Sequence, residues 1–166
     1  MPLIRQMTAS DYDAVGRIFQ AGVDSNNATF EVVSPNWAEF DASHIPACRL
    51  VATVGDAVVG WAALSPTSTR HAYRGVAEVS IYIDPGHVGQ GVGTRLLRRL
   101  INDAENAGYW TLQSSIISEN LASIGLHEKC GFRTVGTREK IGQDQAGQWR
   151  DTTLMERRSA DLVHMS

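Results

Sequence analysis

Three glycines in five positions, Gly89, Gly91 and Gly93, constrain this chain of 166 residues more than any other feature. The apolar run before them, VAEVSIYIDP, predicts a strand that ends at a proline, and the leucines after them recur at helical spacing. Glycine costs roughly 0.5–1 kcal/mol inside regular structure. The stretch is therefore either a tight connection or a place where something comes close to the backbone, and three glycines exceed what a turn needs.

A strand that runs through Gly89-Gln90-Gly91-Val92-Gly93 into a helix would turn successive backbone N–H groups toward one concavity. Because this concavity lies at the positive end of the helix dipole, it would bind anions, above all a diphosphate. The pattern is not a P-loop, since no Gly-Lys-Ser/Thr follows the glycines. It is not the dinucleotide fingerprint either, because the spacing is GxGxG and not GxGxxG.

Composition bounds the class of protein. Hydrophobic residues make up 43% and charged residues 20%, which is typical of one globular domain, and the net charge of −3 disfavours a nucleic-acid binder. No apolar run approaches the length of a membrane span, and the first residues lack the layout of a signal peptide. Cys48 and Cys130 are far apart and predict reduced thiols and no metal site. We expect a cytoplasmic protein with one domain at 1–160, a tail at 161–166, and no membrane or nucleic-acid partner.

The periodicity predicts an α/β fold, a mixed sheet with helices on both faces. In chain order the expected elements are a strand, two helices, three strands, a helix, a strand, a helix and two strands. The first helix should follow an N-cap at Ser10 and end near Phe19. The second should begin at Ser34-Pro35, and Gly55-Asp56 should turn a hairpin.

The glycine stretch resembles the acetyl-CoA pyrophosphate loop of the GCN5-related N-acetyltransferase (GNAT) superfamily, Arg/Gln-X-X-Gly-X-Gly/Ala, although Val88 departs from its first position. The segment ENLASIGLHEKCGF resembles a second motif of that superfamily. Together with NNATF, HAYRGVAEVSIYID and GQWRDTTLM, it resembles the phosphinothricin N-acetyltransferase branch, and YRGVAEVSIYI resembles the sub-branch that acts on methionine sulfone and sulfoximine. The resemblance implies the GNAT acyl-CoA N-acyltransferase fold, with a central, mixed and mostly antiparallel sheet.

The resemblance also implies acetyl-CoA as cosubstrate. The residues that it assigns to the coenzyme are Ile81, Tyr82, Ile83, Gly89, Gln90, Gly91, Val92, Gly93, Thr94 and Asn120. Asn120 would bind the pantetheine arm, but an asparagine at this place is also a good helix N-cap.

Two residues are predicted to be catalytic by this resemblance. Glu78 would be the general base, and burial in its apolar strand would raise its pKa; the alternative is a surface carboxylate on one face of the strand with Ser80 and Tyr82. His127 would protonate the leaving thiolate or line the cleft, or else be a cation at a helix C-terminus.

The implied acceptor is the α-amino group of a small amino-acid-like molecule: phosphinothricin, methionine sulfone or methionine sulfoximine. The residues assigned to this acceptor are Ser68, Thr69, Arg70, Glu78, Val79 and Ser80. Arg70 or Arg74 could clamp a carboxylate. The resemblance also implies a homodimer, and Trp149 could wall the acceptor pocket, from the same subunit or from the partner subunit. Two alternatives stay open: an acetyltransferase of protein or peptide N-termini, and a non-catalytic acyl-CoA-binding module.

Overall fold

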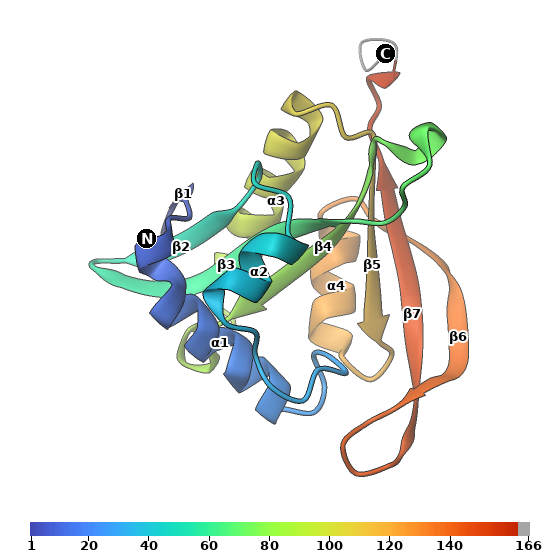
Figure 1. Cartoon of the computed structure of the whole chain (residues 1–166), viewed down its shortest axis with the longest axis horizontal. Helices are drawn as coiled ribbons and strands as arrows, with labels where there is room; N and C mark the ends of the chain where they lie inside the picture. The colour runs from blue at the N-terminus through green and yellow to red at the C-terminus, as the bar shows by residue number, and fades with distance from the viewer. Residues whose placement is uncertain (163–166) are drawn as a thin grey trace.

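A seven-stranded sheet in the order β1-β2-β3-β4-β5-β7-β6 forms the centre of the molecule (Figure 1). The strands are β1 (Leu3–Gln6), β2 (Leu50–Val54), β3 (Ala57–Pro66), β4 (Val76–Ile83), β5 (Thr111–Ile117), β6 (Arg133–Gln143) and β7 (Trp149–Arg158). All neighbours are antiparallel except β4 and β5, which are parallel. The structure, a computed structural model, describes residues 1–162, so most of the tail expected at 161–166 lies outside the described residues.

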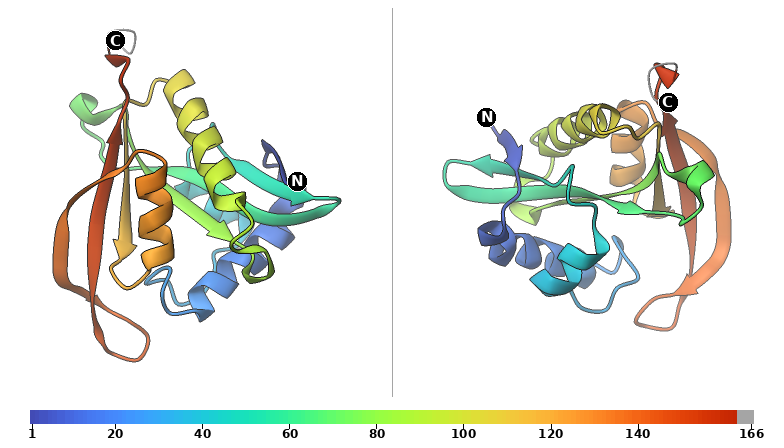
Figure 2. Two further views of the ribbon diagram at one scale, coloured as in Figure 1. Left: turned by 180° about the vertical axis from the view of Figure 1, so that it is seen from behind. Right: turned by 45° about the horizontal axis from the view of Figure 1, so that its top comes forward.

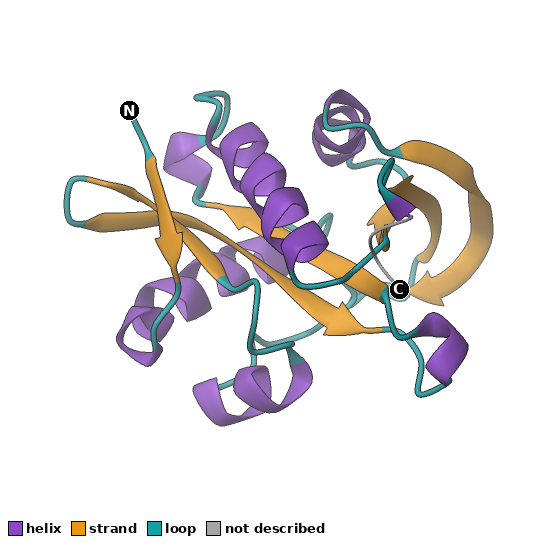
Figure 3. Cartoon of the chain, turned by 90° about the horizontal axis from the view of Figure 1, so that it is seen from above, coloured by secondary structure: helices purple, strands orange, loops and turns teal. Residues whose placement is uncertain are grey.

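Helices cover both faces of this sheet. They are α1 (Tyr12–Asp24), α2 (Trp37–Ser43), α3 (Val92–Asn106) and α4 (Leu121–Lys129), with short 3-10 helices at Ala9–Asp11, His71–Tyr73 and Pro85–His87. The helices α1 and α2 lie on one face, and α3 and α4 lie on the other (Figures 2 and 3). The predicted order of helices and strands is confirmed.

Alternation along β3 divides the core into two layers. Trp61 and Ala63 pack with α1 and α2, whereas Ala62 and Leu64 pack with α3. All four side chains are fully buried. The period-2 pattern of one strand therefore holds a layer of helices on each side.

The first helix is longer than expected. The prediction of an N-cap at Ser10 and an end near Phe19 is wrong, because Ala9–Asp11 is a 3-10 turn and α1 runs from Tyr12 to Asp24. Val23 is buried one turn beyond Phe19 and continues the apolar stripe, so packing against the sheet extends the helix.

The second helix begins two residues later than expected. Its N-cap is Asn36, whose side chain accepts a hydrogen bond from the backbone N–H of Glu39 at 2.9 Å. The Glu39 side chain accepts in return from the Asn36 N–H at 3.0 Å. This reciprocal capping box fixes Asn36, whose backbone is extended, as the N-cap of the helix. Pro35 therefore lies before the helix and not in its first turn.

The parallel pair β4–β5 is short and then opens. Its three residue pairs end at Glu78↔Gln113. Beyond Glu78, β4 stays paired with β3 to Ile83, and β5 stays paired with β7 to Ile117. The two halves of the sheet therefore diverge, with α4 beside the gap (Figure 1). Within residues 1–162, the backbone of residues 79–83 has no strand partner on the β5 side, so its polar groups there are available to a ligand.

Candidate active site

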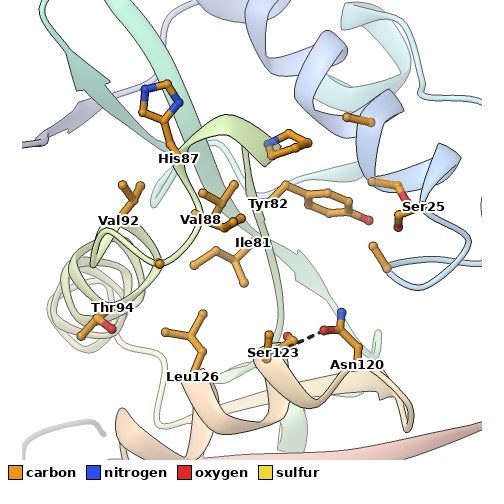
Figure 4. A pocket seen from close by; sticks show the side chains of 18 of the residues that line it. Ser25, Ile81, Tyr82, His87, Val88, Val92, Thr94, Asn120, Ser123 and Leu126 are labelled. Atoms are coloured by element: carbon orange, nitrogen blue, oxygen red, sulfur yellow. Dashed lines mark hydrogen bonds between the residues drawn. The ribbon is translucent and has the colours of Figure 1, made fainter.

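A cavity of about 640 Å³, the helix cavity, lies where the N-terminus of α3 meets the free end of β4, the helix α4 and the end of α1. Figure 4 shows Ile81 and Tyr82 of β4 facing Ser123 and Leu126 of α4 across this space. Nine of the ten residues predicted for the coenzyme line it, and the tenth, Gln90, lies in the loop between two of them. A volume of this size is usual for a small-molecule site.

Glycine is required at the three positions of the loop for two different structural reasons. Gly89 and Gly91 have φ angles of +75° and +79°, in the left-handed region, and a Cβ on either would meet no atom within 4 Å. Gly93 has no such conformation, but its Cβ would lie 3.0 Å from Leu126 Cδ2. The first two glycines therefore shape a loop that faces open space, and the third lets α4 approach α3 closely.

The first turn of α3 is open to an anion. Its N-cap, Gly91, carries no side chain to satisfy the free N–H groups, and no acidic residue lies in the first turn. These N–H groups and the positive end of the helix dipole face the cavity, whose lining also includes Lys129. The arrangement can bind a negatively charged group such as a phosphate.

Asn120 has two contacts at the edge of this cavity. Its Oδ1 accepts a hydrogen bond from the Ser123 N–H at 3.2 Å, so it is the N-cap of α4. Its Nδ2 donates to the backbone oxygen of Asn27 at 3.1 Å and ties α4 to the loop after α1. The capping interpretation is thus confirmed, while binding of a pantetheine arm stays a prediction.

A second cavity of about 370 Å³, the strand cavity, fills the gap between β4 and β5. Five lining residues are common to both cavities: Ala28, Ile81, Tyr82, Asn120 and Ser123. The two spaces therefore meet along the free edge of β4. The strand cavity also contains Glu78, Val79 and Ser80 from β4, and His127 from α4.

Glu78 is a partly buried carboxylate in the strand cavity. Burial raises its pKa, and the hydrogen bond from Gln113 and the positive charge of Arg138 oppose this shift. The Gln113 Nε2 donates to Glu78 Oε1 at 3.5 Å. The expected upward direction of the pKa is confirmed. A carboxylate whose pKa is raised in this way is a more effective proton acceptor near neutral pH.

His127 is buried with a defined tautomer. Its Nδ1 lies 2.7 Å from the backbone oxygen of Ser123, and since a carbonyl only accepts, Nδ1 carries the hydrogen. Its buried Nε2 has no hydrogen-bond partner among the described residues. Burial lowers the pKa of this imidazole. The ring is therefore neutral near pH 7, which disfavours the interpretation of His127 as a helix-end cation.

The loop residues predicted for the acceptor lie elsewhere. Ser68 and Arg70 line a third cavity of about 590 Å³, the outer cavity, together with Trp110 and Gln113. Thr69 is exposed between them. Trp149 is 59% exposed and does not line the strand cavity. The sheet thus brings Glu78, Val79 and Ser80 together and places the other predicted acceptor residues apart from them.

One positioning arginine was not predicted. Arg150 of β7 is buried, and its guanidinium donates to Asn26 O at 2.7 Å and Asn27 Oδ1 at 3.0 Å. It also pairs with Asp144 at 3.2 Å. These contacts fasten the loop after α1, which contributes Thr29 and two neighbours to the strand cavity. A lone arginine inside GQWRDTTLM was the available sequence signal, but its partners Asn26 and Asn27 lie near the other end of the chain.

The fold and this two-cavity site define the class of protein: the chain belongs to the acetyltransferase (GNAT) family, which its residues 17–132 match. It is 35% identical over 162 residues to the phosphinothricin N-acetyltransferase of Alcaligenes faecalis, an alignment that covers 93% of this chain and 81% of that protein. It is also 35% identical over 107 residues to an L-methionine sulfoximine/L-methionine sulfone acetyltransferase of Salmonella typhimurium, covering 64% of this chain and 62% of that one.

Solved structures agree with this assignment. An acetyltransferase of Salmonella typhimurium, determined with its cofactor acetyl-CoA, superposes with a TM-score of 0.86 at 28% identity. The match covers 95% of this chain and 94% of the other. The predicted superfamily is therefore confirmed, and the chain is an acetyltransferase.

Two further observations concern the described residues, 1–162. None of their helices is long and apolar enough to cross a membrane. They contain no cluster of three or more histidine, cysteine or acidic side chains with the geometry of a metal site.

The burial of His127 predicts a specific pH dependence. Its folded pKa lies below the unfolded value of about 6.5, so below that pH the unfolded chain binds more protons. This side chain should therefore lower the free energy of unfolding as the pH falls from 7 to 5. Urea unfolding of the wild type and of His127→Gln should show that the variant loses this part of the pH dependence.

Nitrogen-detected NMR of the His127 ring should find hydrogen on Nδ1 and none on Nε2 at pH 7, and a doubly protonated ring at that pH would contradict the assignment.

Proposed function

We propose that this chain transfers acetyl from acetyl-CoA to the α-amino group of a small amino-acid-like acceptor, by direct transfer with Glu78 as general base. The observation that carries the proposal is the unpaired edge of β4 after Glu78, which borders both cavities. One end of this edge leads to the open first turn of α3, and the other ends at a carboxylate whose pKa is raised. An acyl donor and an amine that lie in the two cavities would meet along this edge.

The helix cavity fits acetyl-CoA on the chemistry of its lining. The first-turn N–H groups of α3 suit the diphosphate, and the free N–H and C=O groups of residues 81–83 suit the amides of the pantetheine arm. The left-handed Gly89 and Gly91 leave the space beside the loop open. When bound, acetyl-CoA supplies an acetyl group activated as a thioester.

The side chains of the strand cavity would carry the proton transfer. Glu78 takes a proton from the ammonium of the acceptor, and the freed lone pair on nitrogen forms the new bond to the acetyl carbon. A free backbone N–H of β4 between residues 79 and 83 stabilises the negative charge that develops on the acetyl oxygen. The bond to sulfur then breaks, and the departing thiolate takes up the second proton that the nitrogen loses as it becomes an amide.

His127 is proposed as a second group at this step. Because its Nδ1 donates to Ser123, its Nε2 is a hydrogen-bond acceptor in the neutral ring. It can orient the attacking amine, and it can protonate the thiolate only after it has gained a proton itself. The geometry favours the first of these two roles.

The acceptor class rests on the relatives and on the lining of the strand cavity. The relatives are named for phosphinothricin and for methionine sulfoximine and sulfone. Phe30, Ile116 and Ile141 offer an apolar wall for side-chain methylenes, and Ser114 and Thr152 offer hydroxyls for a tetrahedral polar head group. We propose these three compounds as acceptors, and a cytoplasmic homodimer as the form that acts on them.

Gly91→Ala tests the coenzyme site. A residue with a Cβ at a left-handed φ costs roughly 1–2 kcal/mol. Gly55→Ala is the matched control, because Gly55 has a φ of +58° and equally open surroundings but lies in the β2–β3 turn. Both variants should lose similar stability, while Gly91→Ala alone should raise the Kd for acetyl-CoA by about 10- to 100-fold through weakened charge-assisted hydrogen bonds. Equal Kd values by calorimetry for the two variants would argue against the loop as the diphosphate site.

Glu78→Gln tests the base. We expect kcat to fall by on the order of 10²–10⁴, with little change in KM for acetyl-CoA. In the wild type, kcat/KM should fall as the pH drops through a pKa above the ordinary value for glutamate, and this limb should disappear in the variant. Glu128→Gln, which removes an exposed carboxylate of α4, should leave the profile unchanged. Wild-type turnover by Glu78→Gln from pH 6 to 9 would show that Glu78 is not the base.

A comparison of acceptors tests the substrate class. Methionine sulfone, methionine sulfoximine and phosphinothricin should have higher kcat/KM values than methionine, whose thioether leaves hydroxyl donors unpaired at roughly 1–3 kcal/mol each. A thiol reagent that detects released CoA measures all four. Equal values for methionine and its sulfone would exclude a pocket that recognises the head group. Activity on peptides alone would favour an N-terminal acetyltransferase, and no thiol release with any amine would favour a non-catalytic module.

A further inference from the structure

We propose that Arg138 of β6 binds the α-carboxylate of the acceptor and so restricts this enzyme to amino acids among small amines. The inference rests on the proposed function, since it names the anchor for the acceptor in that same site. The observation behind it is that Arg138 lines the strand cavity together with Glu78.

The covalent geometry of an amino acid limits where such an anchor can be. The α-amino and α-carboxylate groups share one carbon atom, so they lie within a few ångströms of each other. If Glu78 receives the proton of the amine, the cation that holds the carboxylate must line the same cavity as Glu78. The loop arginine expected from the sequence, Arg70, lines the outer cavity instead.

Three other arginines near this part of the sheet are already engaged. Arg74 lies over the Trp110 ring, 5.1 Å from its centroid. Arg133 and Arg158 both pair with Glu156, at 2.6 and 2.9 Å. Among the described residues, Arg138 has neither an ion pair nor a side-chain hydrogen bond. Arg138 is an exposed residue, and its guanidinium remains available for a bidentate contact with a carboxylate.

The backbone of β6 turns irregular just after Arg138. The register between β6 and β7 shifts between Arg138 and Gly142, and Lys140 has a φ of +50°. The Lys140 N–H donates to Asp151 Oδ1 at 2.8 Å, which holds this irregular segment against β7. Arg138 and Thr152 form the last regular residue pair between β6 and β7 before the irregularity. Both residues line the strand cavity.

Arg138 is also the positive charge that acts on the carboxylate of Glu78. The neutral Gln113 of β5 donates to this carboxylate, and the strand cavity that Glu78 lines also contains the neutral His127 of α4 and the cationic Arg138 of β6. Arg138 lowers the pKa of Glu78 and thus opposes the effect of burial. An acceptor carboxylate that neutralises Arg138 would weaken this opposition, so the base would become stronger when the amino acid is bound.

The experiment compares one acceptor with and without its carboxylate. Methionine sulfone and 3-(methylsulfonyl)propan-1-amine differ in that group, and kcat/KM is measured for wild type, Arg138→Gln, Arg138→Lys, Arg70→Gln and Arg133→Gln. Arg138→Gln should lower the value for the sulfone by roughly 10- to 100-fold, mainly through KM, and change the amine little. Arg138→Lys should recover part of the loss. Arg133→Gln, which removes a paired arginine from the same strand, should affect neither acceptor.

A second measurement does not depend on turnover. The pKa of Glu78, followed by carbon-detected NMR, should rise in Arg138→Gln because a positive charge beside the carboxylate is removed. Calorimetry with CoA present should show weaker binding of methionine sulfone to Arg138→Gln than to wild type.

Three results would overturn the inference: equal losses for both acceptors in Arg138→Gln, a carboxylate-selective loss in Arg70→Gln, or an unchanged Kd for methionine sulfone in Arg138→Gln. If the wild type acetylates neither acceptor, the proposed function fails on these compounds, and the calorimetric binding measurement still decides whether Arg138 is a carboxylate anchor.

Discussion

The divergence of β4 from β5 after Glu78 is the constraint on which the rest of this structure depends. A continuous parallel ladder would satisfy the backbone of residues 79–83 and close the sheet. Because the ladder stops, one edge of a central strand remains free in the middle of the molecule, and both cavities border this edge. An edge of this kind is normally a liability for aggregation, so its presence inside the fold is best explained by a ligand that pairs with it.

The remainder of the fold supports this opening. On one face, α3 is anchored by six buried side chains, so its N-terminus is held at the end of β4. On the other face, Tyr82 of β4 stacks on Phe19 and Trp61, each with a centroid distance of 4.9 Å. Across the gap, Arg150 fastens the loop after α1 to β7. The site is thus built on packed elements, and its loops are tied down by buried hydrogen bonds.

The electrostatics of the strand cavity combine the effect of burial with the positive charge of Arg138. Burial raises the pKa of Glu78 and lowers that of His127, so both groups are displaced toward their neutral forms. The positive charge of Arg138 favours the ionised form of the Glu78 carboxylate. This arrangement places one carboxylate, one neutral imidazole and one guanidinium around the same cavity.

Local pattern in the sequence determined a large part of this protein: the order of the elements, the glycine loop between strand and helix, and the carboxylate in an apolar strand. These features follow from neighbours within a few residues, and alternation and helical spacing report them directly. The ends of α1 and α2 were missed because tertiary burial of Val23 and a capping box at Asn36 decided them. Only the tertiary structure decided which side chains share the cavity with Glu78. Strand order places Arg138, sixty positions later in the chain, beside it, and puts Arg70, eight positions earlier, in another cavity. Proximity across a sheet depends on how the strands are arranged in space, and no local periodicity in the sequence contains that information.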